Sequence, residues 1–235
     1  MLDWAAIRTE LETEDTQKMP APLRVRTVIL AAIQAGYLVP GTRLKETEMG
    51  AAFAVSRTPL REALAALKAE QILELDGDGL RVRKLDWRDI TALYELRANL
   101  DGMAAFLAAQ RASLVERQLI NQICVEEAAL IDDGAEPVTL ARQNRRFHHA
   151  IMQAAGNQFL AESLERLARL MVLTGATAYS LDDRVAPIRN EHVAINDAIQ
   201  NNMPDIAKEK MQEHLANALT ARLTLISLGG GVEVD

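Results

Sequence analysis

The sequence has little cysteine, few aromatic residues and no long apolar run. Its single cysteine, Cys124, cannot form an intramolecular disulfide, and no Cys-x-x-Cys pair is present for zinc or redox chemistry. No stretch approaches the ~20 uninterrupted apolar residues that a membrane-spanning helix needs. The first residues also lack the basic region and apolar run of a secretory leader. These absences predict a soluble, cytosolic protein with no membrane segment.

What the chain does contain is enough apolar material for a core, together with an uneven charge. Apolar residues make up 49% of the 235 residues, a length that favours two domains. The net charge is −7, but residues 20–85 carry +3, whereas residues 1–19 carry −3 and residues 86–235 carry −7. A short basic segment inside an acidic protein indicates local attraction to phosphates.

Residues 20–85 show three helical segments followed by a change of period. Apolar residues recur at helical spacing from about 23 to 36, a short helix is predicted over 46–53, and a third over about 56–71. Apolar and polar residues alternate over 73–75 and again over 80–83, on either side of a turn at 76–79. This pattern predicts a β-hairpin. Three helices and a hairpin are the plan of a winged helix-turn-helix. Residues 1–19 are polar and acidic, and we expect a loose arm there.

From residue 86 onward the pattern is helical throughout. Six helices are predicted, over about 86–111, 113–131, 137–155, 158–179, 183–200 and from the turn at 201–204 to 228. Asp86 can cap the first, and Ser113 with Glu116 forms a capping box for the second. Short connections favour an antiparallel bundle, and three glycines then begin a flexible tail at 229–235. The predicted fold class is therefore mainly α: a winged helix-turn-helix with a small β-hairpin, then an all-α bundle over 86–228.

The start of the third predicted helix carries groups suited to DNA. Ser56 can cap the helix through its side chain, while Arg57 and Arg61 are four residues apart and project from one face near the positive helix end. Such an end binds phosphates and guanine edges. Two arginines alone equally describe a solvated helix face. The preceding helix-turn and the following hairpin, whose Arg81 can reach the minor groove or the DNA backbone, favour DNA binding.

Two runs in this region resemble the DNA-binding domain of the GntR family, and the similarity covers residues 22–85. They are LVPGTRLKE at 38–46 and VSRTPLREAL at 55–64. The resemblance implies that DNA is contacted by Arg43, Ser56, Arg57, Thr58 and Arg61, with Gly79 at the tip of the wing. Gly50 stands where the family usually has alanine, which weakens the second helix slightly.

All four histidines lie beyond the hairpin, and three of them can converge. Asn144 and His148 share a helix face, while His192 and His214 lie on two helices joined near Asn202. Both of these histidines are roughly 15–18 Å from that turn, so an antiparallel pair places them at one height. They could then act as metal ligands inside the bundle. For any single histidine a hydrogen-bonded core or surface role is the commoner one, and His149 points about 100° away from His148.

Four segments of the second region resemble the FCD sensor domain of one GntR subfamily: YELRANLD at 94–101, RRFH at 145–148, NEH at 190–192 and QEHL at 212–215. The resemblance implies a bundle in which an Asp and three His bind a divalent metal that helps to hold a small carboxylate effector. Here Asn144 occupies the Asp position. It is either a weak, neutral ligand beside His148, His192 and His214, which suit zinc or nickel, or a direct contact to the effector. Arg97 either clamps the effector carboxylate or pairs with Asp101.

Together these features predict a transcriptional regulator that forms a homodimer and acts as a repressor. We do not expect it to be an enzyme. Its partners would be double-stranded operator DNA and a small carboxylate such as a sugar acid or organic acid. One alternative is a metal-responsive regulator with the ion itself as the signal. Another is a three-histidine metalloenzyme, but the sequence has no motif such as His-Glu-x-x-His to supply a general base.

Overall fold

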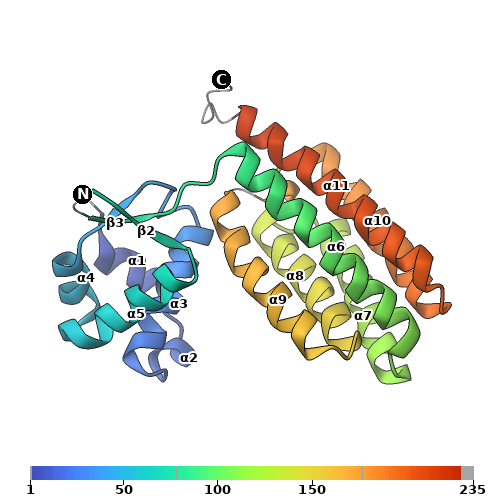
Figure 1. The fold of residues 1–235 in the computed structure, drawn as a ribbon, viewed down its shortest axis with the longest axis horizontal. Coiled ribbons are helices and arrows are strands. Elements are labelled where there is room, and N and C mark those ends of the chain that lie inside the picture. Colours follow the sequence, from blue (N-terminus) through green and yellow to red (C-terminus); the bar gives the residue numbers. More distant parts are fainter. Residues whose placement is uncertain (1, 78, 176, 229–235) are drawn as a thin grey trace. The chain divides into compact units, whose positions relative to one another are not determined.

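The computed structural model describes residues 2–77, 79–175 and 177–228, and over these the chain is mainly helical with one small sheet, as predicted (Figure 1). It divides into two compact units. The first holds the described residues up to Leu85 together with Ala168–Gly175, and the second holds those from Asp86 to Leu167 and those after Gly175. The segment 168–175 was expected to belong with the bundle. The predicted tail at 229–235 lies outside the described residues.

Three helices form the body of the first unit: α3 (Ala21–Gln34), α4 (Glu46–Phe53) and α5 (Arg57–Ala69). The residues that repeat at helical spacing are the buried ones, because one face of each helix packs on the others. On α3 these are Val25, Val28, Ile29, Ala32 and Ile33, and on α5 they are Leu60, Ala63, Leu64 and Leu67. Gly36, with φ 82°, follows α3 and takes the left-handed conformation that favours glycine.

The sheet has one strand more than the sequence predicted. The hairpin of β2 (Leu73–Asp76) and β3 (Gly79–Val82) is joined by β1 (Arg43–Leu44), and the antiparallel order is β1-β3-β2. Arg43 lies opposite Arg81 and Leu44 opposite Leu80. A two-residue strand is too short to show alternation in the sequence, so β1 depends on its partner strand and not on its own pattern.

The loose arm expected at residues 1–19 is wrong for the described residues. They form α1 (Trp4–Leu11) and α2 (Glu14–Gln17), and the side chains of Trp4 and Ile7 are buried. These two residues are three apart and share one helix face, which lies against α4. A segment with only two large buried side chains gives too weak a period to be recognised in the sequence.

The second unit contains the six predicted helices, except for the last three residues of the fourth, which fall in the first unit. The six helices are α6 (Trp87–Arg111), α7 (Leu114–Asp132), α8 (Pro137–Ala154), α9 (Gln158–Leu170), α10 (Asp182–Gln200) and α11 (Pro204–Leu228) (Figure 1). The caps at Asp86 and at Ser113 with Glu116 are confirmed. The fourth helix ends nine residues earlier than predicted, at Leu170, and two 3₁₀ turns follow it, η1 (Met171–Thr174) and η2 (Ala178–Ser180).

In the core of the bundle, α6 contributes small side chains and the other helices contribute larger ones. Ala104, Ala105, Ala108 and Ala109 are all buried in it. At Gly102 a Cβ atom would lie 3.0 Å from Cγ of Gln212, so α6 and α11 approach closely there. Short side chains on α6 allow the neighbouring helices to come near one another, and the polar side chains on their inner faces are thereby brought together.

Candidate functional site

The first candidate site is the N-terminal end of α5. The side chains of Ser56, Arg57, Thr58 and Arg61 are all exposed there. Ser56 occupies the N-cap position, but its side chain makes no capping hydrogen bond, so that part of the prediction is wrong. The backbone N–H groups of the first turn are thus not satisfied by this side chain, which leaves them suited to an anion.

Two of the predicted arginines are paired with carboxylates that sequence reasoning did not single out. Arg61 Nε lies 2.9 Å from Glu46 Oε2, with the side chains 67% and 46% exposed. Arg81 Nε lies 2.9 Å from Asp76 Oδ2. Exposed pairs of this kind contribute roughly 0–1 kcal/mol, so a phosphate or base edge can replace the carboxylate at small cost.

Arg43, Gly79 and Arg81 come together on the small sheet. A Cβ atom at Gly79 would lie 2.7 Å from Arg43 Nε, so the absence of a side chain lets the Arg43 guanidinium lie over the strand. Gly79 thereby gains a role beyond the contact that the family resemblance implies: it positions Arg43. The predicted residues thus form two groups, one on the sheet and one at the start of α5.

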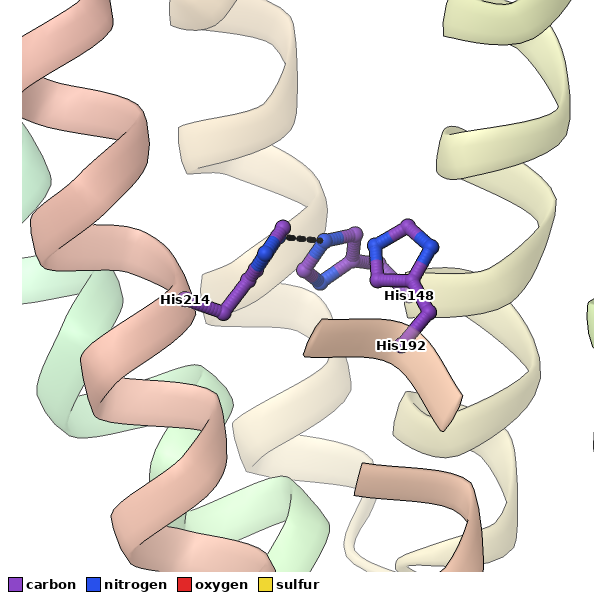
Figure 2. Close-up of side chains that lie close together, drawn as sticks. All are labelled: His148, His192 and His214. Atoms are coloured by element: carbon purple, nitrogen blue, oxygen red, sulfur yellow. Dashed lines mark hydrogen bonds between the residues drawn. The ribbon is translucent and has the colours of Figure 1, made fainter. Parts of the chain in front are cut away.

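The second candidate site lies inside the bundle, where three buried imidazoles converge from three helices. His148 on α8, His192 on α10 and His214 on α11 each offer a nitrogen, and these nitrogens all lie within 4.8 Å of one another. Nε2 of His148 is 3.2 Å from Nε2 of His214 (Figure 2). The sequence predicted that His192 and His214 lie at the same height in the bundle. Their ring centroids are 4.8 Å apart, which agrees with that prediction.

A carboxylate faces Nδ1 of each of these imidazoles. His192 Nδ1 is 2.6 Å from Glu127 Oε2, and His214 Nδ1 is 2.7 Å from Glu191 Oε2. His148 Nδ1 lies farther from its carboxylate, 3.5 Å from Asp101 Oδ1. A histidine that donates Nδ1–H to a carboxylate presents a free Nε2 lone pair, the arrangement of metal-binding histidines. His192 Nε2 is buried without a hydrogen-bond partner in the described part of the chain.

Further polar groups hold these carboxylates. The Tyr179 hydroxyl in η2 donates to Glu127 Oε1 at 2.6 Å, and Arg184 donates to both oxygens of Glu191 at 3.1–3.2 Å. Arg97 Nε donates to Asp101 Oδ2 at 3.0 Å. The structure therefore shows the pairing of Arg97 with Asp101, one of the two roles expected for Arg97. Each imidazole therefore faces a carboxylate, and a further polar side chain orients each of these carboxylates.

The charges of the centre follow from burial and pairing. Burial lowers the pKa of the His214 imidazole to about 3, although its bond to Glu191 acts in the opposite direction. Burial also lowers the pKa of His148 below its ordinary value, against the raising effect of Asp101. Burial by itself would raise the pKa of Asp101, but Arg97 and His148 outweigh it and lower that pKa to about 2. At neutral pH these two imidazoles are neutral and the Asp101 carboxylate is ionised, which suits metal binding.

The remaining predicted ligand, Asn144, is half-buried on α8 one turn before His148. It makes no side-chain hydrogen bond to any residue that the structure describes. Sequence reasoning also missed Glu127, Glu191 and Tyr179. Glu191 is adjacent to His192 in sequence and could have been noticed, whereas Glu127 is 65 residues from His192 and gives no local signal.

Both candidate sites lie in regions that match known protein families. The family model for bacterial regulatory proteins of the gntR family matches residues 23–82, and the model for the FCD domain matches residues 92–217. The chain belongs to the GntR family and carries an FCD domain. Members of this family are DNA-binding transcriptional regulators and not enzymes, so the metalloenzyme alternative is set aside.

Named relatives cover most of the chain. It is 29% identical over 208 residues to the probable D-xylose utilization operon transcriptional repressor of Paenarthrobacter nicotinovorans, covering 88% of this chain and 90% of that protein. It is 28% identical to the HTH-type transcriptional regulator YdhC of Bacillus subtilis, covering 76% and 80%. The structure of E. coli McbR/YncC shares the fold, with a TM-score of 0.71 at 19% identity, over 90% of this chain and 99% of that chain.

A search of the described helices finds none with both the length and the apolar character needed to cross a membrane.

Proposed function

We propose that this GntR regulator binds operator DNA as a homodimer, and that a small carboxylate held at a metal in the FCD domain controls that binding. The observation that supports the metal is the convergence of three buried imidazoles, each with a carboxylate at Nδ1. Without a metal, the buried Nε2 of His192 would have no hydrogen-bond partner in the described part of the chain, which is unfavourable. Three buried imidazole nitrogens are donors that fit a divalent metal ion.

The proposed ligands are His148, His192 and His214, and three imidazoles suit zinc or nickel. A bound metal supplies a positive charge inside the bundle that attracts a carboxylate. Because the three proposed ligands are imidazoles and not carboxylates, none of that charge is cancelled by a directly bound protein anion. We assign Asn144 to the effector side of the centre, either as a weak amide ligand or as a donor to the effector.

Arg97 is the second proposed contact of the effector. Its Nε is used on Asp101, but a guanidinium has further donors in a planar fork that matches a carboxylate. Since Asp101 also faces His148, Arg97 is connected to the centre through one carboxylate. The proposed effector is a sugar acid, with other organic acids as the wider class.

On the DNA side, we assign the contacts to Arg43, Ser56, Arg57, Thr58, Arg61, Gly79 and Arg81. A homodimer presents two α5 helices to a pseudo-palindromic site, and the effector changes their spacing or mobility. A regulator that acts on chromosomal operators works in the cytoplasm.

Metal analysis and operator titration test this proposal. Purified protein should contain about one zinc or nickel per chain. Sugar acids and hydroxy acids should raise the melting temperature in the presence of metal, and a chelator should remove that effect. Absence of metal from protein purified without chelator, together with unchanged melting on adding zinc or nickel, would contradict it.

The same samples distinguish the metal-responsive alternative. Fluorescence anisotropy with the protein's own promoter region is measured with zinc or nickel alone and with the metal plus each acid. A change with metal alone assigns the ion as the signal, whereas a change that needs the acid assigns the acid. Its sign shows whether the effector releases or strengthens DNA binding; both repressors and activators occur by name among the relatives.

A further inference from the structure

The N-terminal helices α1 and α2 precede the GntR match, which begins at residue 23. The family model therefore assigns nothing to them. In the structure α1 lies against α4, the helix before the turn of the helix-turn-helix. It also packs against α3, and its side-chain contacts with α4 include Trp4 on Phe53 and Arg8 on the Ala52 carbonyl, both at the C-terminal end of α4.

An aromatic contact fixes the first turn of α1. The side chain of Trp4 is 2% exposed, and its ring centroid is 6.0 Å from that of Phe53. Phe53 is the last residue of α4 and is itself buried. Aromatic pairs at this separation stabilise a fold beyond the effect of the area that they bury. Trp4 thus holds the end of α4 in place.

Two arginines bind the last carbonyl oxygens of α4. Arg8 from α1 donates to the Ala52 carbonyl, and Arg24 from α3 donates to the Phe53 carbonyl at 3.2 Å. These oxygens lack partners within the helix, and cations at a helix C-terminus are favourable. Glu12 lies 3.5 Å from Arg8 and 3.4 Å from Arg24, and its side chain is only 7% exposed. The network is therefore a mostly buried cap assembled from two helices.

The turn that follows this cap is strained. Ala54 has φ 51° and ψ 44°, the left-handed conformation, which is unfavourable for a residue with a side chain. Two residues later Ser56 is the N-cap of α5 and the first of the predicted DNA contacts at this end of the helix. The conformation of this turn sets the direction of α5 relative to α4. A strained turn persists only where its surroundings hold it.

We propose that Trp4, Arg8 and Glu12 are positioning residues of the DNA-binding domain. They hold the C-terminal end of α4 and the strained turn in one conformation, and so present the start of α5 to the operator in one geometry. None of the three is assigned a DNA contact. The proposal rests on the proposed use of α5 for reading the operator.

Full-length Trp4→Ala and Arg8→Ala proteins test it, assayed by anisotropy well below their melting temperatures. Two duplexes are compared at several salt concentrations, the protein's own promoter and a scrambled sequence of the same length. Loss of one such contact should weaken binding to the promoter by roughly tenfold. Affinity for the scrambled duplex and the salt dependence of binding should stay unchanged, because no phosphate contact is removed.

Conservative and matched variants complete the experiment. Trp4→Phe and Arg8→Lys retain the ring contact or one of the hydrogen bonds, and they should recover most of the discrimination. If the alanine variants do not fold, these two variants should still show a smaller loss of the same kind. Lys18→Ala removes one positive charge from a side chain that is 74% exposed beside Asp15, and it should bind both duplexes like the wild type.

The outcomes separate this inference from the proposed function. Wild-type protein that does not distinguish the promoter from the scrambled duplex would contradict the proposed operator reading itself. Wild-type discrimination that Trp4→Ala and Arg8→Ala retain in full, with only their melting temperatures lowered, would overturn the positioning role alone. Equal losses on both duplexes would also overturn it, since they indicate a general loss of DNA affinity.

Discussion

The polar side chains at the candidate sites of the two units differ in how exposed they are and in how firmly they are paired. At the start of α5 and on the small sheet, the charged groups are exposed or half-buried, and the pairs that two of them form are weak. In the bundle, the three histidines, Asp101 and Glu127 are buried and Glu191 is half-buried, and these residues come from five helices, α6, α7, α8, α10 and α11. An exposed, weakly paired arginine can exchange its carboxylate for a DNA phosphate at small cost. A buried ionised group beside the proposed metal site needs a partner, because an unpaired buried charge is strongly destabilising. The difference predicts which substitutions change binding alone and which also change stability.

The largest effect should come from His192→Ala in the buried centre. The substitution leaves the ionised Glu127 buried with Tyr179 as its hydrogen-bond partner, and breaking a buried pair in this way costs about 3–5 kcal/mol. The free energy of unfolding of metal-free protein, measured in urea, should fall by that amount, and the metal content of untreated protein should fall to zero. His149→Ala, on the exposed side of α8, is the matched control and should alter neither quantity. Wild-type stability in the His192→Ala protein would contradict the proposed pairing.

The exposed unit should respond in binding but not in stability. Arg57→Ala removes an exposed guanidinium at the start of α5, and the loss of a base contact of this kind is worth about 1–3 kcal/mol, or roughly 10- to 100-fold in operator affinity. Anisotropy measures the loss, and the unfolding curve should coincide with that of the wild type. Lys68→Ala removes the same charge from the exposed far end of α5 and should have a small effect. Equal losses in the two variants would mean that α5 contributes only general electrostatic attraction.

Acid should destabilise the bundle over a defined pH range. Burial lowers the pKa of His214 to about 3 in the folded protein, so below its ordinary value of 6.5 the unfolded chain binds a proton that the folded chain does not. Stability of the metal-free protein should therefore be complete above pH 6.5 and fall as the pH decreases toward 3. Urea unfolding at several pH values measures this dependence. His214→Asn should flatten the curve between pH 6.5 and 4, and a wild-type curve already flat over that range would contradict the prediction.

The smallest effect should come from Gly50→Ala on α4. A Cβ atom at Gly50 would meet Leu60 Cδ2 and the Val55 carbonyl at 3.7 Å, both ordinary contacts. Alanine in place of glycine inside a helix stabilises by about 0.5–1 kcal/mol. Urea unfolding should show that gain, with operator binding unchanged. A loss of stability would mean that α4 and α5 pack more tightly here than these distances allow.

Prediction from the sequence succeeded where a feature is local. The run from Ser56 to Arg61 lies on one helix end, and the heights of His192 and His214 follow from counting residues to one turn. It failed where a feature depends on a distant partner. Strand β1 exists through its pairing with β3, and α1 through the packing of Trp4 on Phe53, 49 residues later in the chain. The 3₁₀ turns after Leu170 likewise replaced a predicted continuous helix.

The sequence by itself determined the two families, the helices, the hairpin and the three histidines, because periodicity, caps and motifs are encoded within a few residues of one another. Only the tertiary structure decided which carboxylate faces each imidazole, that Arg97 is paired with Asp101, and that residues 4–12 cap the end of α4. Arg97 and Asp101 are only four residues apart, and the sequence left this pairing as one of two alternatives, whereas most of the other contacts join side chains that are distant in sequence. Packing of the helices brings them together, and burial then makes each partner necessary, since a charge removed from water must be matched by a group that the fold supplies.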